Sequence, residues 1–330
     1  MRICVLGAGA IGGLLAARLS RSGESVSLLA RGESLTVIRS EGLRLVEPDG
    51  AIVVAKELAV ADDLSALGTQ DLVILALKAH QIGAIADRLP VLYHPGTVVL
   101  PLQNGVPWWF FQKFPGPFAG SRLHTLDPDG TIELHIPSDR IVGSIAYPAA
   151  ERKAPGVIAL IEGDRFPVGE LDGHRSERAA DIAHVLTAAG FKSRLLTDIR
   201  AHLWIKAWGN LAFNPISALT GASLAEICRF PATRSLAREM MLEATEIAGK
   251  LGLELRLSVE ARIEGAEKVG DHKTSMLQDV EAGQTLEIEP LIGSFLELGR
   301  LTETPMPATD TVYALVSLLN ARIMAARGGS

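Results

Sequence analysis

A glycine pattern near the N-terminus restricts the fold more than any other feature of this chain. An apolar run at residues 3–6 leads into the hexapeptide GAGAIG, which has the spacing G-x-G-x-x-G, and a helical pattern follows. The first glycine permits a tight turn, the second lets the backbone approach a ligand, and the third allows the helix to pack closely on the strand. The helix N-terminus would then face a pyrophosphate. The pattern predicts a dinucleotide site made by Gly7, Ala8, Gly9, Ala10, Ile11 and Gly12.

A secretory signal is the alternative for this segment, because Arg2 precedes an apolar stretch that extends to Ala17. The stretch contains several glycines, however, and a second strand pattern begins soon after Gly23. Removal of the segment would delete the first strand of a sheet, so we expect it to be part of the fold.

The end of the second strand pattern, residues 25–30, indicates which dinucleotide binds. NAD-binding proteins place an Asp or Glu about 20 residues after the glycines, whereas an Arg there accommodates the 2′-phosphate of NADP. This chain has Arg31 at that place, and its planar guanidinium suits a phosphate. A solvated loop arginine, with Glu33 as the ribose ligand, is the alternative. We predict NADP(H) as the cofactor.

Length and composition fit a soluble enzyme of two domains. The 330 residues exceed the size at which a single core usually stops growing, and 48% of them are hydrophobic. A net charge of −6, without a dense Lys/Arg cluster, argues against a nucleic-acid surface. Cys4 and Cys228 fit neither a metal site nor a redox C-x-x-C motif. We therefore expect free thiols in a cytoplasmic protein, with no bound metal and no membrane segment.

Strand and helix patterns alternate in the first part of the chain and give way to helical patterns after Thr197. Residues 43–46 and 52–54 are expected to form an antiparallel pair, and residues 71–77 and 97–102 to be parallel strands. Further strands are expected at residues 141–147, 157–160 and 165–168, and a helix at residues 177–189. The predicted fold class is α/β: an NADP-binding, Rossmann-type doubly wound sheet in residues 1–196 and an all-helical substrate and catalytic domain in residues 197–330.

Two of the expected parallel strands end in polar residues. Lys78 follows the strand at residues 71–77, and Asn104 follows the strand at residues 97–102. Because ligands bind beyond the carboxyl ends of parallel strands, we expect Lys78 and Asn104 to face the cofactor. For Asn104, which precedes a glycine, a plain turn is the alternative.

A polar stripe marks the first helical segment of the C-terminal half. Lys206, Asn210 and Asn214 are spaced by four, so they share one face of a helix that is otherwise nearly all apolar. An unpaired buried polar group costs about 1 to 3 kcal/mol, so the stripe must face a polar partner or a cleft. The spacing also allows a lysine that extends to solvent and two amides bonded to a neighbouring helix backbone. Pro215 is expected to bend or end the helix.

Together these residues resemble the ketopantoate reductase family. The matching features occur in the family's order: the glycine loop with Arg31, Leu77-Lys78-Ala79, Gln103-Asn104-Gly105, the stripe Lys206/Asn210/Asn214-Pro215, and Ser275-Met276-Leu277-Gln278-Asp279 with Glu287 downstream. The resemblance extends over nearly the whole chain, and the lysine stripe and the serine segment are not general features of dinucleotide-binding folds.

The resemblance implies NADPH-dependent reduction of 2-dehydropantoate to pantoate, on the route to pantothenate and coenzyme A. Lys206 would donate a proton to the keto oxygen, and Glu287 would complete the catalytic pair. The implied substrate contacts are Asn104, Lys206, Asn210, Asn214 and Ser275, with Ser275 at the substrate carboxylate. Asn104 and Ala149 would also contact the cofactor. A cationic lysine stabilises the developing alkoxide, and a nearby carboxylate helps to keep the lysine charged. For Glu287, an exposed carboxylate at a helix start, beside Glu289, is the alternative.

Two places depart from the family's pattern. An asparagine that some members have shortly after the Asn-Pro is missing, and Ser223 is the nearest polar residue. Trp108-Trp109-Phe110-Phe111 begin a longer link after the Asn-Gly turn, and these aromatics either line the substrate cleft or pack beneath the loop. If they line the cleft, another 2-oxo acid or carbonyl compound becomes the expected substrate. A non-catalytic NADPH sensor is the third alternative, and we also consider a homodimer.

Overall fold

The computed structural model describes residues 1–328, which form two compact units. Unit 1 comprises residues 1–103, 111–122 and 129–199, and within the described chain it holds the strands. Unit 2 comprises residues 104–110, 123–128 and the described residues from Arg200 onward, and it is built from helices. Two short segments of the N-terminal half therefore belong to unit 2, and the first of them carries Asn104.

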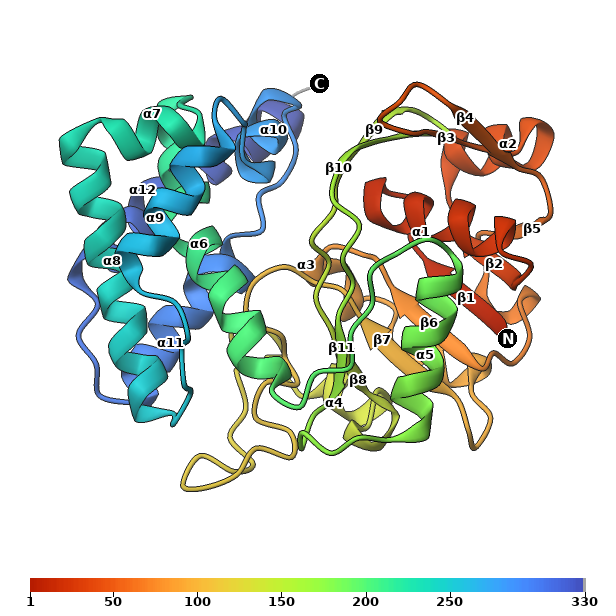
Figure 1. The fold of residues 1–330 in the computed structure, drawn as a ribbon, viewed down its shortest axis with the longest axis horizontal. Helices are drawn as coiled ribbons and strands as arrows, with labels where there is room; N and C mark the ends of the chain where they lie inside the picture. Colours follow the sequence, from red (N-terminus) through yellow and green to blue (C-terminus); the bar gives the residue numbers. More distant parts are fainter. Residues whose placement is uncertain (329–330) are drawn as a thin grey trace. The chain divides into compact units, whose positions relative to one another are not determined.

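The main sheet of unit 1 is parallel, with the strand order β5-β2-β1-β6-β7 (Figure 1). Its strands are β1 (Arg2–Leu6), β2 (Ser25–Leu29), β5 (Leu58–Ala61), β6 (Leu72–Leu75) and β7 (Val98–Pro101). The apolar runs of β6 and β7 are wholly buried, as expected for parallel strands that are covered on both faces. Because all four strand pairings are parallel, the carboxyl ends of the strands meet at one edge. The predicted Rossmann-type sheet is confirmed.

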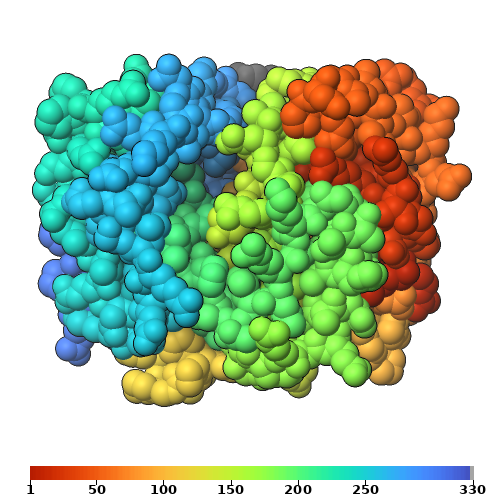
Figure 2. All heavy atoms as spheres, viewed as in Figure 1, coloured from red at the N-terminus to blue at the C-terminus, as the bar shows by residue number. Residues whose placement is uncertain are grey.

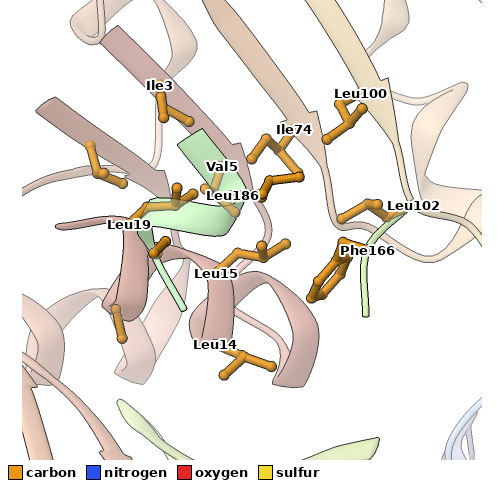
Figure 3. Close-up of a cluster of buried hydrophobic side chains, with 14 of the residues drawn as sticks. Ile3, Val5, Leu14, Leu15, Leu19, Ile74, Leu100, Leu102, Phe166 and Leu186 are labelled. Carbon is orange, nitrogen blue, oxygen red and sulfur yellow. The ribbon is translucent and has the colours of Figure 1, made fainter. Parts of the chain in front are cut away.

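Helix α1 (Ala10–Arg21) is fixed to this sheet by a buried apolar cluster. Leu15 and Leu19 of α1 lie in the same cluster as Ile3 and Val5 of β1 and Leu186 of α5 (Glu177–Ala188) (Figure 3). Full burial of one such leucine contributes about 1.5 to 3 kcal/mol. The cluster therefore holds firmly the helix that begins at the glycine loop.

A second sheet packs against α1 and was not expected from the sequence. The expected antiparallel pair is confirmed as β3 (Leu43–Val46) and β4 (Ile52–Ala55), and β9 (Ala149–Ala154) and β10 (Val157–Glu162) extend it in the order β4-β3-β10-β9. A Cβ atom on Gly13 of α1 would lie 2.6 Å from Cγ1 of Ile158, so a glycine is needed for this close packing. The remaining strands and α-helices of unit 1 are β8 (Val142–Ser144), β11 (Val168–Glu170), α2 (Gly32–Glu41), α3 (Ala79–Ile82) and α4 (Thr131–His135).

Unit 2 confirms the expected helical half. Its helices are α6 (Ile199–Thr220), α7 (Leu224–Arg229), α8 (Pro231–Lys250), α9 (Val259–Val269), α10 (Ser275–Glu281), α11 (Ser294–Leu301) and α12 (Pro307–Gly328), with a π-helical turn at Glu289–Gly293. On the face drawn in Figure 2, the side chains of α8 and α9 form much of the surface of this unit. Within residues 1–328, each helix is too short or too polar to cross a membrane.

Helix α6 does not end at Pro215, so this part of the prediction is wrong. The helix continues for five residues beyond the proline, to Thr220. Proline removes only one intrahelical hydrogen bond. Phe213 and Ile216, on either side of it, are each 2% exposed, and this burial keeps the segment helical.

Candidate active site

The glycine loop has the geometry of a phosphate cradle. Gly7 has φ +111°, and a Cβ atom on Gly12 would lie 1.9 Å from the carbonyl oxygen of Gly7, so both positions require glycine. A Cβ atom on Gly9 would instead meet no atom within 4 Å, which leaves the surface of the loop open. Gly9 is also the N-cap of α1 and supplies no side-chain cap, so the first N–H groups of the helix are available to an anion.

The other predicted cofactor residues of unit 1 lie at strand ends or on the second sheet. Arg31 is exposed at the N-cap of α2, two residues after β2 ends. Lys78 is half-buried at the N-cap of α3, three residues after β6 ends. Arg31 and Lys78 thus follow the same edge of the sheet as Gly7. Ala149 is the half-buried first residue of β9, a strand that packs against α1.

Lys206 and Asn104 meet directly, although 102 positions separate them in the sequence. The Nζ atom of Lys206 donates a hydrogen bond to Oδ1 of Asn104 over 2.7 Å. Asn104 belongs to the segment of unit 2 that follows β7, and Lys206 lies in the second turn of α6. The structure therefore brings together two of the residues that were expected to contact the substrate.

The protein environment of Lys206 shifts the pKa of its ammonium group. Burial lowers the pKa to about 8, and the negative charge of Glu287 opposes part of that shift. Glu287 is half-buried, whereas Glu289 is exposed and accepts a hydrogen bond from the Tyr313 hydroxyl at 2.9 Å. Glu289, rather than Glu287, is thus the exposed carboxylate at a helix start. The negative charge of Glu287 instead favours the protonated form of Lys206.

A contact that the sequence did not reveal holds the Asn104 segment. The N–H of Val106 donates a hydrogen bond to the carbonyl oxygen of Pro290 at 3.0 Å. Gly105 has φ +81°, and a Cβ atom on it would lie 1.9 Å from the same oxygen. Pro290 belongs to the π-helical turn that begins two residues after Glu287, and such turns are frequent at functional sites. One contact therefore ties the Asn104 loop to the Glu287 segment.

The remaining residues of the stripe differ in their surroundings. Asn214 is buried, and its Nδ2 atom donates to Oγ of Ser275 at 3.5 Å, so it contacts a side chain rather than a neighbouring helix backbone. Ser275 is exposed and begins α10 after Thr274, whose hydroxyl caps that helix. Asn210 is half-buried, and among residues 1–328 its side-chain amide has no hydrogen-bond partner. This part of α6 thus presents amide and hydroxyl groups beside Lys206.

The four consecutive aromatic residues are packed in the protein interior. Trp108, Trp109, Phe110 and Phe111 are between 0% and 6% exposed. In unit 2 the Phe110 ring lies 5.8 Å from the ring of Trp204, which is two residues before Lys206 on α6. The structure supports the alternative in which these aromatics pack beneath the loop.

Comparison with known proteins identifies the family of this chain. Residues 3–173 match the model of the family described as ketopantoate reductase PanE/ApbA, and residues 198–320 match the model of its C-terminal part. The chain belongs to the ketopantoate reductase family. The resemblance found in the sequence is confirmed.

Related proteins match the chain over almost its full length. A 2-dehydropantoate 2-reductase of Mesorhizobium japonicum is 48% identical over 320 residues, which cover 97% of this chain and 98% of the relative. A solved structure from Ralstonia solanacearum, assigned to the ketopantoate reductases, is 39% identical with a TM-score of 0.93 and covers 98% of both chains. A D-mandelate dehydrogenase, solved with NADH and anilino(oxo)acetate, shares the fold at 23% identity, with a TM-score of 0.83 over 98% of this chain and 99% of the other.

Proposed function

We propose that this ketopantoate reductase family member reduces 2-dehydropantoate to pantoate with NADPH, in the cytoplasm, on the route to pantothenate and coenzyme A. The observation that carries the proposal is the short contact between Lys206 and Asn104, with Glu287 acting on the same ammonium group. The 48% identity to a 2-dehydropantoate 2-reductase supports the choice of substrate. We assign cofactor binding to residues 1–196, and substrate binding and catalysis to residues 197–330.

The residues of unit 1 fit a nicotinamide dinucleotide. Residues 7–12 would hold the pyrophosphate, since the open surface at Gly9 and the uncapped N-terminus of α1 suit an anion. Arg31 would hold the 2′-phosphate, and Lys78 and Ala149 would lie along the cofactor, with Asn104 beside the nicotinamide. NADPH, when bound, supplies the hydride for the carbonyl carbon of the substrate.

Residues of unit 2 would stabilise negative charge on the keto oxygen of the substrate and protonate it. Protonated Lys206 would stabilise negative charge on that oxygen and donate the proton that completes the alcohol. Asn104 holds the ammonium group in place, and Glu287 favours its charged form. Asn210, Asn214 and Ser275 would hold the remaining polar groups of the substrate.

We expect the reductive kcat/KM to fall as pH rises through about 8, the value to which burial lowers the Lys206 pKa. The proton-donating form is fully populated below that pKa and is lost above it. Glu287→Gln should move the fall to lower pH, because the Glu287 charge raises the Lys206 pKa. A pH profile of NADPH oxidation for both proteins tests this. A fall at the same pH in both would show that Glu287 does not set the protonation of Lys206.

Arg31→Ala should remove most of the preference for NADPH over NADH. A guanidinium suits the 2′-phosphate, and each charge-assisted hydrogen bond contributes roughly 1.5 to 3 kcal/mol. Titration calorimetry of both cofactors with both proteins measures the preference. Glu33→Ala is the control for ribose binding and should leave the preference in place. Equal affinities in the unmodified protein would contradict the assignment of NADPH.

An NADPH-oxidation assay with a panel of 2-oxo acids, ketopantoate included, tests the proposed function itself. The panel should also contain phenylglyoxylate, because the D-mandelate dehydrogenase of the same fold was solved with an aromatic 2-oxo acid analogue. Turnover of another acid in preference to ketopantoate would favour the alternative substrate. Tight NADPH binding without any turnover would favour a sensor. A Staphylococcus aureus ketopantoate reductase is described as dimeric, and light scattering would test the homodimer that we propose here.

A further inference from the structure

Glu287 lies in a stretch of unit 2 that has no regular secondary structure. Residues 284–287 precede the π-helical turn at Glu289–Gly293, and neither a helix nor a sheet fixes their backbone. The neighbours Leu286 and Ile288 are 4% and 5% exposed, whereas Glu287 is half-buried. The position of the Glu287 carboxylate therefore depends on the contacts that other elements make with this stretch.

Helix α12 forms hydrogen bonds with the chain on each side of Glu287. Oδ1 of Asn320 accepts a hydrogen bond from the N–H of Leu286 over 3.0 Å, and the Tyr313 hydroxyl donates to Glu289 at 2.9 Å. Asn320 and Tyr313 are seven residues apart, which is two helical turns, so they share one face of α12. This face of α12 therefore brackets Glu287.

The two bonds differ in what they hold. Asn320 is half-buried and bonds the backbone directly before Glu287. Its Nδ2 group lies 3.8 Å from Sδ of Met324, one turn further along α12, so its Oδ1 atom faces the stretch. A partly buried N–H that loses its acceptor is costly, and the stretch would have to shift to regain one. Tyr313 instead bonds an exposed carboxylate, where water can take its place.

We propose that Asn320 is a positioning residue for the reaction. It holds the backbone at Leu286 and so keeps the Glu287 carboxylate where its negative charge acts on the lysine that donates the proton. This inference rests on the proposed function, which makes Lys206 that donor. Asn320 acts through Glu287, so its removal should mimic a partial loss of Glu287, because the interaction of two charges weakens as they move apart.

Asn320→Leu tests the proposal, because leucine has a similar size, favours a helix more than asparagine and lacks the acceptor oxygen. Glu287 raises the pKa of Lys206 against the effect of burial, so a displaced carboxylate lowers that pKa. The pH at which the reductive kcat/KM falls should therefore move down by roughly 0.5 pH unit. Asn320→Asp keeps an acceptor oxygen and should not move it down. An unchanged profile in Asn320→Leu, or a downward shift in Asn320→Asp, would overturn the proposal.

The other ionisable groups at this turn do not account for such a shift. Burial raises the pKa of the Tyr313 hydroxyl, so it stays neutral as Lys206 titrates, and Arg300 of α11 stays charged. Glu289 is the same in all of these proteins. The shift therefore reports on Lys206 and Glu287.

Two further comparisons separate positioning from a general loosening of the fold. In the Glu287→Gln background, Asn320→Leu should cause no additional shift, because the charge through which Asn320 acts is already gone. Tyr313→Phe removes the exposed bond on the other side of Glu287 and should leave the profile in place. An additional shift in the double variant, or an equal shift in Tyr313→Phe, would contradict the proposal.

A titration of Lys206 itself separates this inference from the proposed function. The ¹³C resonance of its Cε atom, identified by its absence in Lys206→Ala, follows protonation whether or not the protein reduces ketopantoate. If no reduction occurs, the proposed function fails, and a lower titration midpoint in Asn320→Leu than in the unmodified protein still supports the role of Asn320. Equal midpoints in the two proteins overturn it.

Discussion

Lys206→Ala is expected to lower turnover of ketopantoate by roughly two to four powers of ten and to leave NADPH binding largely intact. The alkoxide that forms on the keto oxygen would lose both its nearest positive charge and its proton donor. Asn104, which accepts the Lys206 hydrogen bond, cannot replace that proton donor because a neutral amide does not give up its N–H protons near neutral pH. Steady-state NADPH oxidation and calorimetric titration of NADPH measure the two quantities separately.

Lys250→Ala is a suitable control for the removal of a lysine from unit 2. Lys250 ends α8 and pairs with Glu246 at 2.9 Å on the surface, so its loss should leave turnover unchanged. Glu287→Ala should slow the reaction as well, and the double variant with Lys206→Ala should be less than additive if the two groups act together. Near-normal turnover of Lys206→Ala would show that the lysine is structural.

The parts of the fold that follow from local chemistry could be predicted from the sequence. The contact between Gly12 and Gly7 is made within six residues, so the hexapeptide alone defines the loop. The buried runs of β6 and β7 identify central strands for a similar reason, since both of their faces are covered. The second sheet lacks such a signal: β9 is mostly exposed, half of its residues are charged, and it pairs with β10 and packs against α1.

Part of the candidate site could likewise be predicted from the sequence, and part of it could not. The spacing of Lys206, Asn210 and Asn214 placed them on one helix face, and the family resemblance supplied Glu287 as their partner. The spacing could not show that α6 runs on through Pro215, because tertiary burial decides that outcome. Nor could it show the hydrogen bond from Val106 to Pro290, a contact between two segments that lie far apart in the sequence.

Gly105→Ala is expected to lower turnover about a hundredfold, although residue 105 has no side chain that could touch a substrate. The new Cβ atom would lie 1.9 Å from the carbonyl oxygen of Pro290, and backbone cannot yield as a flexible side chain can. The loop must move away, which breaks the Val106–Pro290 hydrogen bond and displaces Asn104 from Lys206. A displacement of about 1 Å in a catalytic arrangement can cost a factor of about 100. Turnover measured together with thermal unfolding tests this expectation.

The variant Gly252→Ala separates this clash from the cost of backbone conformation. Gly252 has φ +72°, close to the +81° of Gly105, but an added Cβ atom there meets nothing within 4 Å. Both variants should therefore lose roughly 1 to 2 kcal/mol of unfolding free energy, because alanine is unfavourable in the left-handed conformation. Only Gly105→Ala should also lose turnover, because only there does the methyl group push the Asn104 loop away from the π-helical turn after Glu287. If the two variants lose turnover equally, the contact with Pro290 does not position Asn104, and the loop must be held by other interactions.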